Sequence, residues 1–172
     1  MEEPLPAGGS CLLGSINLSE FVLNPFTKES KFDFVEFRRC VAHAVKGLND
    51  VLDEGLPLHP LKIQKDTAKD WRQIGLGIMG LADMFIKMGI TYGSEPSKTL
   101  SNHIGDAMIK SAIQESAELS GIHGAYPKCD TAKIVNTPFI INNVNQALAN
   151  KIIQNGLRNS QLLTIPPCGS IA

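Results

Sequence analysis

The sequence lacks the features that mark several large classes of protein. No apolar stretch approaches the roughly 20 residues of a membrane-spanning helix, and the first residues have neither the basic start nor the apolar run of a signal peptide. Charge of neither sign predominates, since 16 basic residues stand against 17 acidic ones. We therefore expect a cytoplasmic protein with no overall attraction to nucleic acid or to membranes.

Cysteine is scarce and scattered. The four cysteines form no C-x-x-C pair and have no histidine at ligand spacing, which argues against a structural zinc site. In a reducing compartment they are thiols, and buried small hydrophobic residues by default. Repeats and low-complexity linkers are absent as well, so we expect one domain, 1–172.

The patterns that are present are mainly helical. Asp33 with Glu36 three residues later resembles a capping box, and apolar residues then recur at helical spacing until Gly55. Other segments carry similar signals of start, period and stop. The expected elements are helices over about 33–55, 66–88, 94–121 and 145–155, and short strands over 11–18 and 161–165.

Gly75, Gly77 and Gly80 have the spacing G-x-G-x-x-G, which is also the fingerprint of a dinucleotide-binding loop. That loop requires a strand before its first glycine, whereas the preceding residues DTAKDWRQI are charged and of helical character. A nicotinamide-dependent oxidoreductase is therefore a weaker alternative. We expect the glycines to lie in a buried helix and to let it approach its neighbours closely.

The two ends of the chain carry the residues of chemical interest. From the residues alone, Glu2 is an exposed carboxylate, Cys11 a core thiol and PCGSIA (167–172) a turn. After Pro167, the backbone N–H groups of Gly169 and Ser170, with the serine hydroxyl, resemble an anion-binding nest. Read without any family, the helices also fit a non-catalytic helical assembly module.

Several long motifs resemble those of the catalytic, large subunit of ribonucleotide reductase, in the same order along the chain. EEPLP (2–6) and GSCLLGSINL (9–18) resemble the end of the family's Asn-x-Cys-x-Glu segment and its Gly-Ser-Cys-x-Leu-Gly-Ser-Ile-Asn-Leu segment. IGLGIMGLAD (74–83) resembles the family's Ile-Gly-Leu-Gly-Val-Met-Gly-Leu-Ala-Asp segment, which we expect to be a helix. ITYGSE, GAYP and TIPPCGSIA (164–172) resemble its later loops, the last its phosphate loop. The implied fold is part of a ten-stranded α/β barrel, mainly α with a few short strands.

The resemblance implies reduction of a ribonucleotide to a 2'-deoxyribonucleotide, for DNA synthesis, by a thiyl-radical mechanism. Glu2 matches the glutamate that acts as general base on the 3'-hydroxyl, and Cys11 matches the second member of the cysteine pair that supplies two electrons. The substrate phosphates would be bound by Pro167, Cys168, Gly169, Ser170 and Ile171. Cys168 stands where the family usually has threonine, so that hydroxyl is missing.

The radical cysteine and the first reducing cysteine have no counterpart among the 172 residues. The chain thus resembles a fragment of the catalytic barrel, and we expect the fragment alone to be inactive and to associate with copies of itself. The resemblance implies further partners, namely the rest of the catalytic subunit and a thioredoxin-type reductant. The short spacing from Glu2 to Cys11 is most like the adenosylcobalamin-dependent class, and a separate metal-bearing radical subunit is the alternative.

Overall fold

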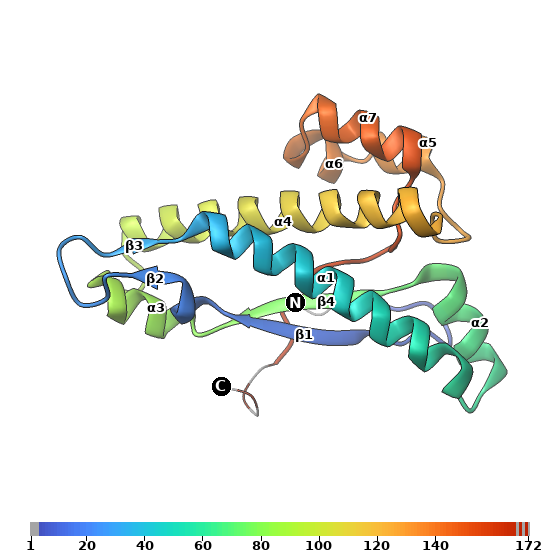
Figure 1. Cartoon of the computed structure of the whole chain (residues 1–172), viewed down its shortest axis with the longest axis horizontal. Helices are drawn as coiled ribbons and strands as arrows, with labels where there is room; N and C mark the ends of the chain where they lie inside the picture. The colour runs from blue at the N-terminus through green and yellow to red at the C-terminus, as the bar shows by residue number, and fades with distance from the viewer. Residues whose placement is uncertain (1–3, 168, 170, 172) are drawn as a thin grey trace.

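Two long helices lie side by side over one face of a pair of parallel strands (Figure 1). The computed structural model describes residues 4–167, 169 and 171. The helices are α1 (Phe34–Gly55) and α4 (Glu95–His123), and the strands are β1 (Leu12–Asn17) and β4 (Ile74–Met79). The described chain is therefore mainly helical, with strands at its centre, as expected of this part of an α/β barrel.

Strand β4 lies between β1 and the end of the chain. Its register with β1 runs from Leu12 opposite Ile74 to Asn17 opposite Met79. On its other edge, the segment 161–165 runs parallel to it through a bridge between Leu76 and Leu163. The predicted strand at 11–18 is confirmed, and the one at 161–165 is present as an extended segment with this single bridge.

Side chains cap three of the helices at their N-termini, where the sequence places the helix starts. Asp33 accepts hydrogen bonds from the N–H groups of Val35 and Glu36, and Ser94 accepts one from Ser97 N. Asn145 accepts one from Leu148 N at the start of α7 (Gln146–Asn155). Each cap satisfies N–H groups that have no partner within the first turn.

The predicted helix over 66–88 is wrong in its middle. The segment divides into α2 (Lys62–Trp71), strand β4 and α3 (Leu81–Met88). Helix α2 ends because Arg72 takes a left-handed conformation with φ of 45°, which costs an ordinary residue about 1–2 kcal/mol and is usually signalled by glycine. The alternation of glycine with Ile, Leu and Ile in IGLGIM is a period of two, typical of a strand.

The remaining elements fall where no regular structure was expected. They are η1 (Leu18–Phe21), β2 (Val22–Leu23), β3 (Lys31–Phe32), η2 (Leu56–Leu58), α5 (Thr131–Val135) and α6 (Pro138–Asn143). Helices α5, α6 and α7 pack on the side of α4 away from the strands (Figure 1). None of the helices in the described residues is long and apolar enough to cross a membrane.

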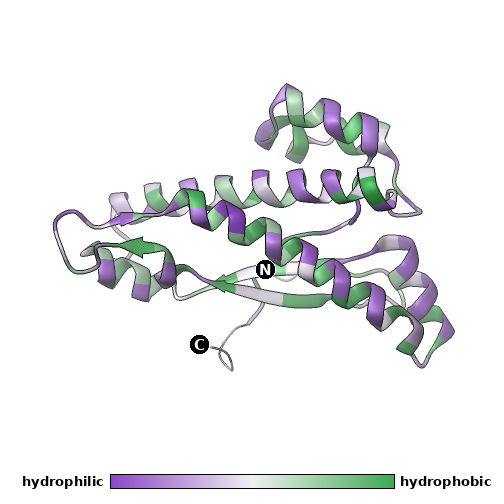
Figure 2. Cartoon of the chain, viewed as in Figure 1, coloured by the Kyte–Doolittle hydropathy of each residue, from purple (hydrophilic) through white to green (hydrophobic). Residues whose placement is uncertain are grey.

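The larger hydrophobic core lies between the strands and the helices α1, α3 and α4. Ile74 and Leu76 of β4 and Val41 and Val45 of α1 are almost completely buried there. A smaller cluster around Ile113 joins α4 to α6 and α7. Figure 2 shows hydrophilic residues gathered on the helices and loops, whereas β4, and β1 before its last residue Asn17, are apolar or neutral. The strands are thus packed on one face, against α1, α3 and α4.

Candidate active site

The two faces of the strand pair have different neighbours. A Cβ atom added at Gly14 would lie 3.5 Å from a methyl group of Leu48 on α1, so this glycine faces the helices. A Cβ atom added at Gly75 would instead meet Cys11, Leu13 and Thr164, none of which lies on a helix. Since side chains alternate between faces along a strand, Cys11 and Leu13 lie on the face away from α1.

The Cys11 thiol lies over the backbone of Gly75. A Cβ atom at Gly75 would be 2.7 Å from Cys11 Sγ and 2.7 Å from Thr164 Cγ2. Cys11 precedes β1 and is partly buried, and Thr164 belongs to the segment on the other edge of β4 and is 5% exposed. Two residues that are 153 positions apart in the sequence are thereby brought to the same point of the sheet.

The backbone of the terminal segment lies close to Gly77, the next glycine on the same face of β4. A Cβ atom added at Gly77 would lie 2.8 Å from the Thr164 backbone oxygen and 3.2 Å from Pro166 Cδ. The segment is held by hydrogen bonds from Leu76 N to Leu162 O (2.8 Å) and from Thr164 N to Leu76 O (3.1 Å). The two glycines therefore allow a close approach, as expected, but they do so in a strand.

The segments near the two ends of the chain also meet beside this point, at the amino ends of the strands. Gln161 Nε2 donates a hydrogen bond to the backbone oxygen of Pro4 at 2.9 Å. Gln73, buried at the start of β4, donates to the side-chain oxygen of Gln161. This proximity of the two ends distinguishes the barrel reading from a helical assembly module, for which no such meeting is expected.

The predicted site residues divide into two groups. Glu2, Cys168 and Ser170 lie outside the described residues. Pro167, Gly169 and Ile171 are exposed, and the chain leaves the sheet after residue 165 on the side away from α1 and α4 (Figure 1). Cys11 and this exit are therefore on the same side of the strands.

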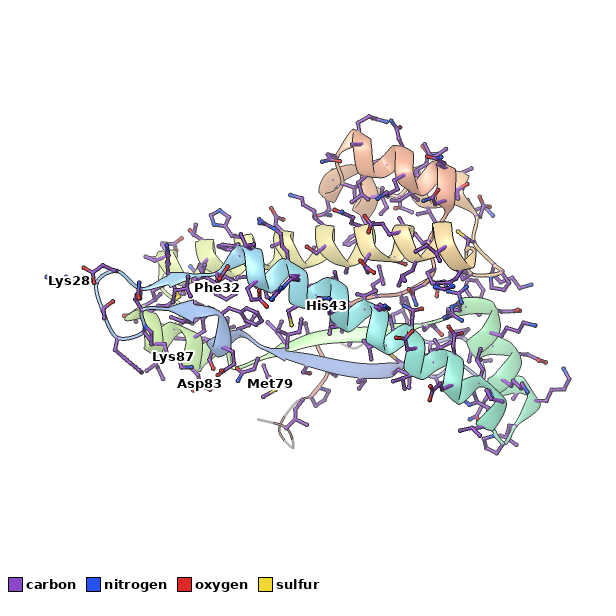
Figure 3. The ribbon with its side chains drawn as sticks, viewed as in Figure 1. Lys28, Phe32, His43, Met79, Asp83 and Lys87 are labelled. Atoms are coloured by element: carbon purple, nitrogen blue, oxygen red, sulfur yellow. The ribbon has the colours of Figure 1, made fainter. Side chains whose placement is uncertain are left out.

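At the carboxyl ends of the strands, Asn17 accepts a hydrogen bond from Ser19 N at 3.2 Å and caps η1. Gly80 takes a φ of 68° beside it, and a side chain at this position would overlap Asn17 Oδ1. Figure 3 places Met79, the last residue of β4, on the side of the ribbon away from His43 of α1. Beyond this point β4 turns into α3.

A buried polar network that the sequence did not reveal holds the terminal segment at its other end. Asn159 is fully buried, and its side-chain amide donates to Asn49 Oδ1 and to the backbone oxygen of Arg72, both at 2.9 Å. Its side-chain oxygen accepts from Asn49 Nδ2 (3.0 Å) and Ser116 Oγ (3.1 Å). The network joins α1, α4 and the start of β4 to the segment that leads to Thr164.

The same network contains an ion pair. The buried Arg72 donates to Asp53 Oδ2 at 2.9 Å and to Asn49 Oδ1 at 3.0 Å, and Arg158 lies 3.4 Å from Asp53. Burial is the largest single influence and raises the pKa of Asp53, but the hydrogen bonds and charges of Arg72 and Arg158 together outweigh it and lower the pKa. The residue with the left-handed backbone is thus also the one whose side chain is held by Asn49 and Asp53.

Two other thiols lie away from this face. Cys40 is partly buried on α1, and burial raises its pKa. Cys129 is near Tyr126, whose pKa is raised to about 12 by burial and by Cys129. Among the described residues, no group of three or more His, Cys, Asp or Glu side chains could hold a metal ion.

Comparison with known proteins gives a consistent result. Residues 1–172 match the barrel domain of ribonucleotide reductase. The large subunit of ribonucleoside-diphosphate reductase from Danio rerio is 33% identical over 172 residues, which cover 94% of this chain and 21% of the relative. The large chain from Encephalitozoon cuniculi is 30% identical over 160 residues (88% and 21%). A vitamin B12-dependent ribonucleoside-diphosphate reductase from Thermoplasma acidophilum is 39% identical over 129 residues (73% and 16%). The chain spans about a fifth of the length of these relatives.

Proposed function

Since the chain belongs to the ribonucleotide reductase family through its barrel domain, we propose that it forms part of a catalytic subunit that reduces ribonucleotides to 2'-deoxyribonucleotides. In this proposal residues 1–172 form one domain that contributes β1, β4 and the extended segment 161–165 to the barrel. The observation that carries the proposal is that Cys11 and Thr164 meet over Gly75. They do so on the face of the strands away from α1, called the open face below. A reducing thiol and the entry to a phosphate loop are needed together at one site.

In this proposal Cys11 is one of two thiols that reduce the substrate. The pair gives up two electrons and two protons as its S–S bond forms, the 2'-hydroxyl leaves as water, and the 2'-carbon gains hydrogen. The partner thiol and the thiyl radical that takes the 3'-hydrogen come from the rest of the subunit. A thioredoxin-type dithiol then reduces the disulfide by exchange, which restores Cys11.

The proposed contacts with substrate lie at the two ends. Glu2 removes the 3'-hydroxyl proton as the 2'-hydroxyl leaves, which requires a carboxylate within hydrogen-bond reach of the sugar. Residues 167–171 bind the phosphates through backbone N–H groups and the Ser170 hydroxyl. The exposed position of Pro167 and Gly169 on the same side as Cys11 supports this assignment.

For the radical generator we propose adenosylcobalamin, with a separate metal-bearing subunit as the alternative. The sequence around Cys11 and the vitamin B12-dependent relative support this choice. The large subunits from Danio rerio and Encephalitozoon cuniculi are not named as vitamin B12-dependent. When bound, the cofactor supplies the radical that is passed to a cysteine. No residue of this chain is assigned to it.

The open face of the strands is proposed to be covered by the rest of the subunit. Leu13 of β1 is 52% exposed on this face, although it is a large apolar residue of a strand. An apolar residue there is stable once other strands or copies of the chain pack against it. Self-association of the isolated chain is expected for the same reason.

A complementation assay tests the proposal. The chain is mixed with separately expressed flanking pieces of its open reading frame, and nucleotide reduction is measured with a dithiol, with and without adenosylcobalamin. Activity that requires cobalamin and is lost with Cys11→Ser is the expected result. Absence of activity under both conditions, from pieces shown to associate, contradicts the proposal and favours a non-catalytic helical assembly module.

A further inference from the structure

The space over Gly75 is filled from both sides. The three atoms nearest to an added Cβ are Cys11 Sγ at 2.7 Å, Thr164 Cγ2 at 2.7 Å and Leu13 Cδ2 at 2.8 Å. All three distances are too short for a real side chain. At Gly14, on the helical face, the corresponding distances begin at 3.5 Å and are ordinary contacts. The absence of a side chain therefore matters much more at Gly75.

As a consequence, the side chains of Cys11 and Thr164 approach each other across β4, although they come from segments on its two opposite edges. Both Cys11 Sγ and Thr164 Cγ2 lie within 2.7 Å of one point above Gly75, so they are separated by at most twice that distance. Neighbouring strands are 4.7–4.9 Å apart, so residues on the two outer strands are usually separated by about twice that distance and by the side chains of the central strand. Here no side chain intervenes.

From this arrangement we infer that Gly75 is a positioning residue for the Cys11 thiol, an inference that rests on the proposed function for its catalytic meaning. The missing side chain lets the thiol lie against Thr164, two residues before Pro166 and the proposed phosphate loop. Any side chain at position 75 forces the thiol away from that segment. The distance between the reducing sulfur and the bound substrate is thereby fixed by a residue that touches neither substrate nor cofactor.

Gly77 has different neighbours, which provides an internal comparison. The nearest atoms to a Cβ added there are the Thr164 backbone oxygen and Pro166 Cδ, and Cys11 is not among the three nearest. A side chain at Gly77 is therefore expected to displace the backbone of the terminal segment, whereas one at Gly75 meets the side chains of Cys11 and Thr164 and pushes the thiol away from that segment. The two glycines of one strand control two different parts of the site.

A cross-linking experiment on the chain itself tests the inference. Cys40, Cys129 and Cys168 are replaced by serine and Thr164 by cysteine, so that only Cys11 and the new thiol remain. Dibromobimane, a short reagent that joins two nearby thiols by displacement of its two bromides, then forms the intrachain cross-link. Gly75→Ala is expected to slow this reaction about tenfold or more, because the added methyl group lies between the two sulfurs.

The matched control is Gly105→Ala on α4, where an added Cβ meets nothing within 4 Å. Its cross-linking rate should equal that of the parent. An equal rate for a folded Gly75→Ala chain overturns the inference, and so does failure of the parent pair to cross-link.

A double-mutant cycle covers the case in which Gly75→Ala folds poorly. With Cys11→Ala the sulfur atom is removed, so Gly75→Ala should lower the melting temperature or soluble yield less than it does when Cys11 is present. An equal loss in both backgrounds overturns the inference.

In the reconstituted enzyme, Gly75→Ala should lower kcat while KM stays within about twofold, because phosphate contacts remain. The two claims can fail separately. If the cross-linking rate depends on Gly75 but the reconstituted enzyme is inactive even with Gly75, the proposed reductase function is wrong and the placement of the thiol is still supported.

Discussion

Apart from Gly14, the residues that face α1 from the strand pair are large, apolar and at least partly buried, whereas those on the opposite face are small, polar or partly exposed. Ile74 and Leu76 on the helical face are 0% and 1% exposed. On the other face Leu13 is 52% exposed, and Cys11 lies over a glycine. The helical face supplies stability, and the open face supplies room for chemistry. Substitutions on the two faces should therefore have separable effects.

The largest expected effect is on activity and comes from the open face. Cys11→Ser in the reconstituted reductase should reduce multiple-turnover activity to background, because serine cannot form the disulfide that supplies two electrons. The chain should keep its melting temperature. Cys40→Ser, a partly buried thiol on α1, is the control and should retain activity; comparable loss in both variants would break the comparison.

The next effect is on stability and comes from the helical face. Leu76→Ala should lower the free energy of unfolding by about 2–5 kcal/mol, because it leaves a cavity among closely packed side chains. Leu13→Ala, a leucine of the neighbouring strand on the open face, should cost much less. Urea denaturation measures both, and equal losses would show that the open face is packed as tightly as the other.

A smaller loss is expected from the buried network that holds the terminal segment. Asn159→Ala removes two hydrogen bonds of Asn49 and the bond to the Arg72 backbone oxygen, at a cost of about 1–3 kcal/mol. Asn102→Ala, on the exposed surface of α4, is the matched control. The variant should also slow the cross-link between Cys11 and cysteine at position 164, since the segment loses its anchor. Unchanged stability and cross-linking would remove the network from the account.

The smallest expected effect is a loss of folding stability at acidic pH. The folded-state pKa of Asp53 is lowered, so its pairing with Arg72 stabilises the chain above the ordinary carboxyl pKa of about 3.9 and is lost as the pH falls through the folded value. Because Asp53 is 47% exposed, screening limits the size of this effect. Unfolding free energies measured from about pH 6 to about pH 3 should fall more steeply for the parent than for Asp53→Asn. Parallel curves would contradict this role.

The sequence predicted the long helices well because their signals are local. Asp33, Ser94 and Asn145 each cap a helix within a few residues of the pattern that predicts it. It failed between residues 72 and 80 because the reason that α2 ends is not local. Arg72 takes a glycine-like backbone, and the partners that stabilise it are Asn49 and Asp53, about twenty residues earlier.

The candidate site was predictable only in part. The family motifs identified Cys11 and the terminal loop, but the role of Gly75 depends on which strands flank β4, and that is a property of the fold. Asn159 carries no local signal, since a buried asparagine is distinguished only by its hydrogen bonds to residues 43 and 110 positions away. Alternation of glycine with large apolar residues in IGLGIM was the available clue to a strand with one open face.

The central claim is that Cys11 gives up electrons to a ribonucleotide, and a single-turnover experiment tests it most directly. The reconstituted enzyme is reduced, freed of dithiol, given substrate for one turnover and quenched with an alkylating reagent, and the Cys11 peptide is then identified by mass spectrometry. The account predicts that Cys11 is in a disulfide in proportion to the deoxyribonucleotide formed. Deoxyribonucleotide formed while Cys11 is recovered alkylated, as a free thiol, would contradict it.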